Sequence, residues 1–276
     1  MEVGSEQPIK EEIMGPATEL PGSSPPEIGF SVFHQKVELD IDFELKRVKG
    51  RTEIIIIPNS KDLRTLRLNC RQCMLTRINV NSKGPTLKYS DPYRRIKVFE
   101  SATAHQYHQV QRHLEPIIKY PPDEELVVNL PRAIRIEDNH VEDLNVAYAP
   151  ITISVEFVVD RYRDGIHFVG CDESDNRFPQ VYTKNTITPG SACCLFPCID
   201  NLISRSTWDI SISFPKTVGD ALHRVGVHKD NDSEMRDEDH RDEEAGLEML
   251  VVCSGEVTDE VCIQNALSEV LHWIVL

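Results

Sequence analysis

Short runs in which apolar and polar residues alternate strictly are the feature that most limits how this chain can fold. From Trp208 to Phe214 every second residue is apolar, and the residues between them are Asp or Ser. The same alternation runs through Ile151–Val159. A period of two residues is typical of a strand with one buried face, and several such runs separated by turn residues predict an all-β domain.

Further runs agree with this fold class. Ile54–Ile57 is β-branched throughout and precedes Pro58, which is typical of a strand buried on both faces. Only residues 102–114 favour a helix, because they contain neither Gly nor Pro. We therefore expect an all-β, mainly antiparallel fold, as a sandwich or a strongly curved sheet, with one short helical insertion. The first strand begins near Phe30, and its apolar residues share one parity: Phe33, Val37, Leu39, Ile41 and Phe43.

The composition changes at both ends of the chain and in one insertion. Residues 1–29 are rich in Gly, Pro, Ser and Glu, so we expect a disordered tail before one domain over residues 30–276. Residues 229–244 are mainly charged and acidic, which predicts a solvated loop. Leu250–Gly255 is expected to be a strand entering a turn, with no further strand after it to close the sheet. We therefore expect the domain to be incomplete at its C-terminal end.

The charge of the chain limits its partners. A formal net charge of −15 repels phosphate backbones on average, so binding of nucleic acid would need a local basic patch. Arg64, Arg67 and Arg71 alternate along one segment, but we interpret them as an ordinary solvated face. No basic and apolar leader is visible at the N-terminus, and the apolar segment 270–276 is too short to span a membrane. The eight cysteines are therefore expected to be thiols in the cytosol or nucleus.

The spacing of histidines does not match a zinc peptidase. Such an enzyme needs His-Glu-x-x-His on a helix, and that motif is absent from the sequence. His105 and His108 lie on the expected helix without an acidic third ligand in register. We therefore expect no catalytic residue in this chain and no bound cofactor.

The cysteines raise the question of a structural metal. Cys70 and Cys73 have the spacing of half a zinc site, and Cys193, Cys194 and Cys198 could supply the other half. The two groups lie far apart in the sequence, whereas zinc ligands usually come from closer pairs. Thiols packed in or near the core are therefore the favoured interpretation, with a structural metal as the lesser alternative.

One motif resembles the N-terminal β-domain of the zinc aminopeptidases. Phe196-Pro197-Cys198 with Asp200 precedes the strand at Trp208, as in those enzymes. An alignment without gaps places Thr188 where they carry the group that holds the free amine of the substrate. A hydroxyl cannot supply the negative charge that a desolvated amine needs. The resemblance therefore implies the scaffold of these enzymes without their substrate anchor.

Several motifs in order resemble another family more closely, namely subunit 2 of the general transcription factor TFIID. They extend over residues 30–257 and are Phe30–Val37, Leu68–Cys73, Gly165–Val169, Phe196–Asp200 and Thr207-Trp208. The resemblance implies an aminopeptidase-like saddle without peptidase activity, acting in the nucleus as a scaffold. It implies a role in core-promoter recognition and in assembly of the RNA polymerase II preinitiation complex. The implied partners are other TFIID subunits and, through the whole complex, core-promoter DNA, with weak or no DNA contact by this chain alone and no membrane.

The residues that carry the motifs are expected to be structural rather than reactive. Asp200 is expected to accept backbone N–H groups at a turn, and His34 and His167 to be buried or half-exposed histidines in apolar strands. The structural motif residues are Phe196, Pro197, Cys198, Asp200, Trp208 and His167. Two other interpretations stay open: the N-terminal β-domain of a genuine zinc aminopeptidase whose catalytic domain is missing from this chain, and a standalone β-rich interaction module.

Overall fold

The computed structural model describes most of the folded part of the chain. The expected tail apart from Gly29, the acidic loop at 229–244 and Thr188 lie outside the described residues. The described ranges are 29–95, 104–119, 125–140, 146–172, 175, 177–183, 191–200, 205–222, 245–262 and 268–275.

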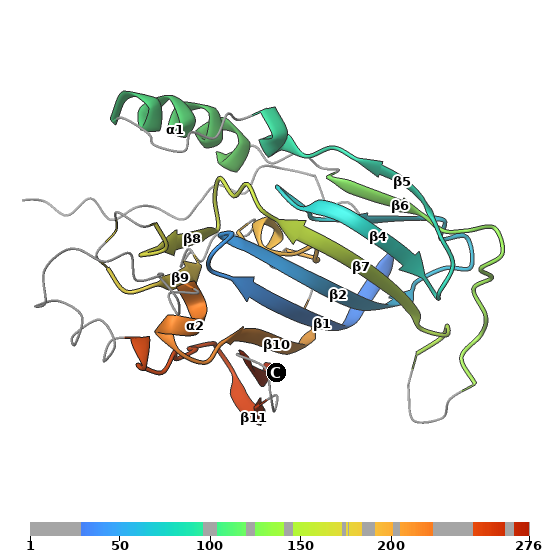
Figure 1. Ribbon diagram of the computed structural model, residues 1–276. Coiled ribbons are helices and arrows are strands. Elements are labelled where there is room, and N and C mark those ends of the chain that lie inside the picture. Colours follow the sequence, from blue (N-terminus) through green and yellow to red (C-terminus); the bar gives the residue numbers. More distant parts are fainter. Residues whose placement is uncertain are drawn as a thin grey trace, which may run out of the picture.

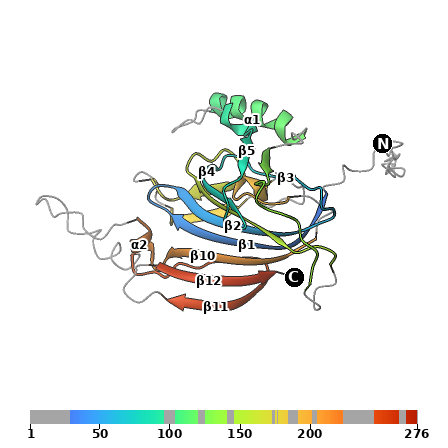
Figure 2. The ribbon, with the colours of Figure 1, turned by 90° about the vertical axis from the view of Figure 1, so that its right-hand side faces the viewer.

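A large sheet of seven strands organises the described residues (Figure 1). Its order is β11-β12-β10-β1-β2-β7-β4, and only the β1–β10 pair is parallel. Figure 2 shows β2, β1, β10, β12 and β11 following one another across this curved sheet. The strands are β1 (Phe30–Asp42), β2 (Arg47–Pro58), β4 (Met74–Val80), β7 (Ile151–Val159), β10 (Thr207–Pro215), β11 (Glu256–Cys262) and β12 (Ser268–Val275).

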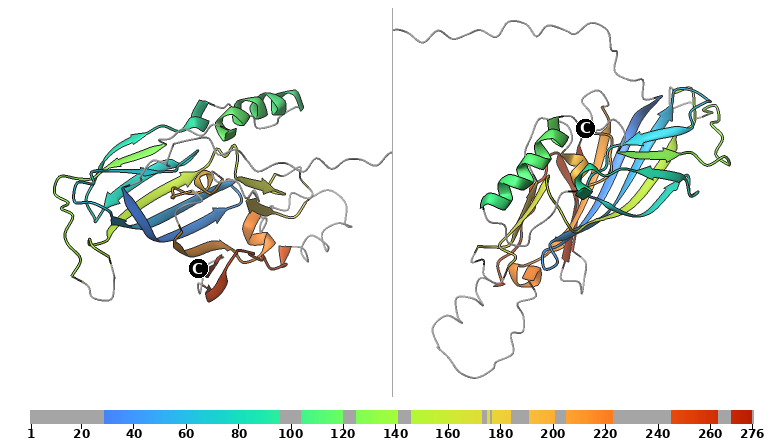
Figure 3. Two further views of the ribbon diagram at one scale, coloured as in Figure 1. Left: turned by 180° about the vertical axis from the view of Figure 1, so that it is seen from behind. Right: turned by 90° about the horizontal axis from the view of Figure 1, so that it is seen from above.

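Smaller elements surround the large sheet. One sheet has the order β3-β6-β5, and β8 pairs with β9 as a separate ribbon. The helix α1 and the strand β11 lie at opposite borders of the molecule, as Figures 2 and 3 show. The elements are β3 (Thr65–Leu68), β5 (Thr86–Tyr89), β6 (Leu126–Asn129), β8 (Ile166–Val169), β9 (Gln180–Thr183), α1 (Ala104–Lys119), α2 (Val218–Leu222), and the 3-10 turns η1 (Pro92–Arg95) and η2 (Ala192–Cys194).

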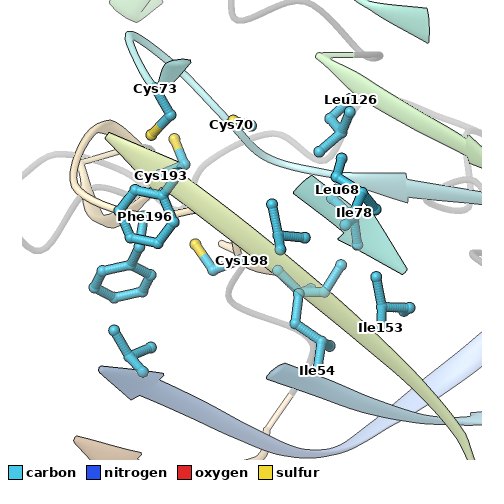
Figure 4. Packing of buried hydrophobic residues seen from close by; sticks show 14 of the residues in the cluster. Ile54, Leu68, Cys70, Cys73, Ile78, Leu126, Ile153, Cys193, Phe196 and Cys198 are labelled. Atoms are coloured by element: carbon cyan, nitrogen blue, oxygen red, sulfur yellow. The ribbon is translucent and has the colours of Figure 1, made fainter. Parts of the chain in front are cut away.

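The predicted fold class is confirmed. The described strands form mainly antiparallel sheets, and the one long helix, α1, falls where the sequence predicts a helical insertion. The core lies between one face of the large sheet and the β3-β6-β5 sheet, because alternating residues of both belong to one buried cluster. Figure 4 shows Ile54, Ile78 and Ile153 of the large sheet close to Leu68 and Leu126 of the smaller one.

The prediction for Phe33 is wrong. Its side chain is 48% exposed, whereas Phe30 and Val32 are buried. The pairing of β1 with β2 shifts between Val32 and His34, so a β-bulge reverses the alternation at this point. A bulge adds one residue on one strand only, and the apolar pattern of that strand does not reveal it.

The strand predictions for residues 250–276 are also wrong. Leu250–Gly255 forms no strand, and two strands follow it. β12 pairs with β10, and β11 pairs with β12. The open edge of β10 offers backbone groups for pairing, and this can recruit a segment that lacks clean alternation.

Candidate functional site

Two motif segments that are distant in sequence cross each other beside the core. The backbone N–H of Asn69 donates to the backbone carbonyl of Cys198 over 2.8 Å. The backbone N–H of Cys198 donates to the backbone carbonyl of Asn69 over 3.0 Å. The amide of Arg71 donates to the carbonyl of Cys193 over 2.8 Å. These bonds join the Cys70–Cys73 motif to the Phe196-Pro197-Cys198 motif, which the sequence linked only through the less favoured alternative of a shared structural metal.

The crossing gathers cysteines from both segments. Figure 4 shows four of them beside Phe196, and all five are buried: Cys70, Cys73, Cys193, Cys194 and Cys198. None of these five takes part in a disulfide. The position of these cysteines in the core agrees with the favoured interpretation.

The surroundings of Cys73, Cys193 and Cys198 favour the protonated thiol. Burial is the main cause that raises the pKa of the Cys73 and Cys198 thiols. A hydrogen bond with Cys194 and burial raise the pKa of the Cys193 thiol. Only a thiolate is a strong nucleophile or metal ligand, so the arrangement favours packing over reaction. Among the described residues, no group of three or more His, Cys, Asp or Glu side chains is arranged to hold a metal ion.

A buried ion pair lies under the crossing. Arg71 Nε donates to Glu125 Oε1 over 2.6 Å, and the Arg71 and Glu125 side chains are 4% and 0% exposed. Glu125 Oε2 accepts the amide of Cys70 over 2.8 Å. Burial raises the pKa of Glu125, and the charge of Arg71 opposes this shift only in part. The interpretation of Arg71 as part of a solvated face is therefore wrong.

The side chain of Gln72 fastens a third segment to the crossing. Its amide nitrogen donates to the carbonyls of Asp164 and Cys194 over 2.6 and 2.8 Å. Its amide oxygen accepts the backbone N–H of Arg163 over 2.7 Å and that of Asp164 over 3.2 Å. Gln72 itself has a φ of 50°, in the left-handed region that residues other than Gly rarely adopt. Neither Gln72 nor Glu125 was singled out from the sequence; a Glu directly before the buried run at Leu126 was the available signal for Glu125.

The structure places five of the six predicted motif residues at or beside this crossing. Phe196, Pro197 and Cys198 are buried, and the ring of Phe196 meets the edge of Trp208 at 5.8 Å between centroids. Asp200 Oδ2 accepts the backbone N–H of Cys193 over 3.2 Å. These contacts are ring packing and a hydrogen bond from a backbone N–H to a side-chain carboxylate.

The two histidines lie elsewhere. His167 is on β8, where its ring stacks on Tyr182 of β9 at 5.1 Å between centroids. His34 is on β1, where its Nδ1 is 2.7 Å from Thr207 Oγ1 and its Nε2 is 3.4 Å from a carboxylate oxygen of Asp209. His167 therefore does not join the other motif residues.

A shallow hollow lies on the other face of the large sheet. Its lining includes Glu38 and Asp40 of β1, which pair in register with Arg51 and Lys49 of β2. Opposite charges on neighbouring strands compensate each other, so this face fits a solvated sheet surface. None of the helices in the described ranges is long and apolar enough to cross a membrane.

Comparison with known proteins identifies what this chain is similar to. No protein-family model matches it. TFIID subunit 2 of Schizosaccharomyces pombe is 29% identical over 249 residues, which cover 83% of this chain and 20% of that protein. The resemblance to TFIID subunit 2 is confirmed. The same protein of Drosophila melanogaster is 26% identical over 194 residues, covering 68% of this chain and 16% of that protein. The chain thus spans about a fifth of the length of the curated TFIID subunit 2 proteins that it matches.

Solved structures with some similarity are zinc peptidases and related hydrolases. The M1 zinc metallopeptidase of Deinococcus radiodurans has 9% identity and a TM-score of 0.48, over 90% of this chain and 39% of that one. Native leukotriene A4 hydrolase of Saccharomyces cerevisiae has 14% identity and a TM-score of 0.46, over 72% of this chain and 27% of that one.

Proposed function

We propose that this protein acts in the nucleus as a non-catalytic scaffold subunit of TFIID. In this role it supports core-promoter recognition and assembly of the RNA polymerase II preinitiation complex, with other TFIID subunits as its direct partners. The observation that carries the proposal is its similarity to TFIID subunit 2 proteins of fungi and animals, at 24–29% identity over 68–83% of this chain. Core-promoter DNA is contacted through the whole complex.

The chemistry of the crossing supports a structural role. Its thiols are buried, burial raises the pKa of Cys73 and Cys198, and the buried carboxylate of Glu125 is held by Arg71 and a backbone amide. Such groups fix the relative positions of segments but offer no accessible nucleophile or base. We propose that Phe196, Pro197, Cys198, Asp200 and Trp208 serve this packing, and that residues 30–276 act as one aminopeptidase-like β-domain.

Co-precipitation from nuclear extract tests the proposal. The full chain carries an affinity tag, and recovered proteins are identified by mass spectrometry. We expect several TFIID subunits together, at levels well above those recovered by a tagged acidic protein of similar size. Recovery of none of them by a chain whose circular dichroism indicates folded β-structure would contradict the proposal.

A second measurement addresses the peptidase interpretation. The full chain is incubated with an aminoacyl reporter that fluoresces on hydrolysis, with and without a metal chelator. The proposal expects no turnover above buffer in either case. Turnover by the purified protein that the chelator abolishes would favour a zinc aminopeptidase instead.

A further inference from the structure

The segment that precedes β11 exposes apolar side chains to an unusual degree. Leu250 and Val252 are 85% and 87% exposed, more than any other large hydrophobic side chain in the described ranges. They lie two residues apart, so an extended chain presents them on the same side. Leu247 and Val257, on either side of this pair, are also exposed. Apolar side chains that gather on a surface mark a site that another surface covers.

Within the described part of the chain, the backbone of residues 250–252 also has no hydrogen-bond partner. The preceding residues are paired, because Met249 donates to the carbonyl of Lys216 over 2.8 Å and Val218 donates to that of Leu247 over 2.9 Å. No backbone hydrogen bond found among the described residues involves Leu250, Val251 or Val252. The segment leads into β11, the border strand of the large sheet (Figure 2). Extended backbone with open N–H and C=O groups is a template for an added strand.

The charge around the segment identifies the kind of strand that fits. Residues 245–262 contain no Lys or Arg, and their charged residues are Glu248, Glu256, Asp259 and Glu260. The chain as a whole carries a net charge of −15. A second copy would bring like charges together, whereas a basic partner would be attracted.

We propose that Leu250–Cys253 is a docking strand for an extended, basic segment of a separate protein. The partner adds to this segment as a β-strand: main-chain hydrogen bonds hold it, and alternate side chains pack on Leu250 and Val252. Lys or Arg residues at the ends of the partner strand face Glu248 and Glu256. The inference goes beyond the proposed function and does not depend on it, since membership of TFIID says nothing about this segment.

The test uses the full chain and a synthetic probe. The probe is a fluorescent peptide of alternating Val and Thr with two Lys at each end, and binding is followed by fluorescence anisotropy. We expect a Kd of about 10 µM or tighter, and at least about tenfold weaker binding when Glu replaces every Lys. Methylation of alternate backbone nitrogens of the probe should abolish binding, because it removes the hydrogen-bond donors of one strand edge.

Two double variants locate the site. Leu250→Thr with Val252→Thr should weaken binding of the basic probe at least about tenfold, because both contacts lose buried apolar surface. Leu45→Thr with Leu87→Thr is the matched control, since these leucines are exposed on the β1–β2 turn and on β5, and it should bind like the wild type. Thermal melts of both variants check that they fold.

Three outcomes would overturn the proposal. The basic probe does not bind, the acidic probe binds as tightly as the basic one, or the Leu250/Val252 variant binds the basic probe as tightly as the wild type. Sedimentation of the protein without the probe tests whether a second copy of this chain occupies the segment instead. A dimer that the Leu250/Val252 variant abolishes would assign the segment to a second copy of this chain. Failure to recover TFIID subunits from nuclear extract would leave this result unaffected.

Discussion

Gln72 holds three segments together from an unfavourable backbone conformation. Its amide makes hydrogen bonds with Arg163, Asp164 and Cys194, and all but one of these distances are 2.8 Å or shorter. A φ of 50° costs free energy for a residue with a side chain, so the amide contacts must outweigh that cost. The conformation is therefore a consequence of the tertiary contacts rather than of local sequence.

We expect Gln72→Ala to lower the free energy of unfolding by about 3 kcal/mol, because it keeps the unfavourable φ and leaves buried backbone groups without partners. Urea denaturation at neutral pH measures the loss. Gln180→Ala on β9 is the matched control, because Gln180 is exposed, and it should change stability by less than about 0.5 kcal/mol. Equal effects of the two substitutions would contradict the assigned role of Gln72.

The pair of Arg71 and Glu125 predicts a particular pH dependence. Burial raises the pKa of Glu125 above its ordinary value of 4.5, so the folded protein holds this proton more tightly than the unfolded chain does. Stability contributed by such a group is fully present below the ordinary pKa. It is lost as pH rises from the ordinary pKa through the raised one.

Glu125→Gln isolates this contribution, because the amide cannot titrate. The wild type minus variant difference in unfolding free energy should shrink as pH rises above about 4.5 and then level off. Denaturant titrations of both proteins at a series of pH values measure it, and other carboxylates cancel in the difference. A difference that grows with pH would mean that attraction to Arg71 dominates burial and lowers the pKa.

The strands were predictable where one alternating face meets the core. Ile54–Ile57 and Ile151–Val159 were found from sequence because apolar residues of both segments pack into the core between the two sheets. The crossing of the two cysteine segments was not, since its backbone pairs join residues more than a hundred positions apart. Glu125 and Gln72 act through the same distant contacts, so no local pattern marks their partners.

The β-bulge in β1 places Phe33 on the exposed side and Val37 on the buried side, and substitutions at these two positions test this assignment. Phe33→Thr should change the free energy of unfolding by less than about 1 kcal/mol, because the ring is half exposed. Val37→Thr should cost about 2 kcal/mol, because it places a hydroxyl at a fully buried position of nearly equal volume. Thermal and urea unfolding of the two variants measure the contrast. If Phe33→Thr lowered the free energy of unfolding more than Val37→Thr, Phe33 would have to be buried, and the β-bulge between Val32 and His34 would be contradicted.

The distribution of charge over the chain argues against direct binding of DNA. Duplex binding releases counterions from several phosphates and needs several cations on one face. On the β3-β6-β5 sheet only Arg67 and Lys88 flank Val127 in register, and on the large sheet the cations face carboxylates. The net charge of −15 opposes approach to phosphate on average.

We therefore expect the full chain to bind a short core-promoter duplex no better than a control protein of similar size and net charge. A gel-shift series at two salt concentrations measures this, and Arg67→Glu with Lys88→Glu should leave the result unchanged. Low-micromolar binding that weakens steeply with salt would contradict the prediction. If binding stays absent, any contact of this protein with promoter DNA must come through basic surfaces of its partners.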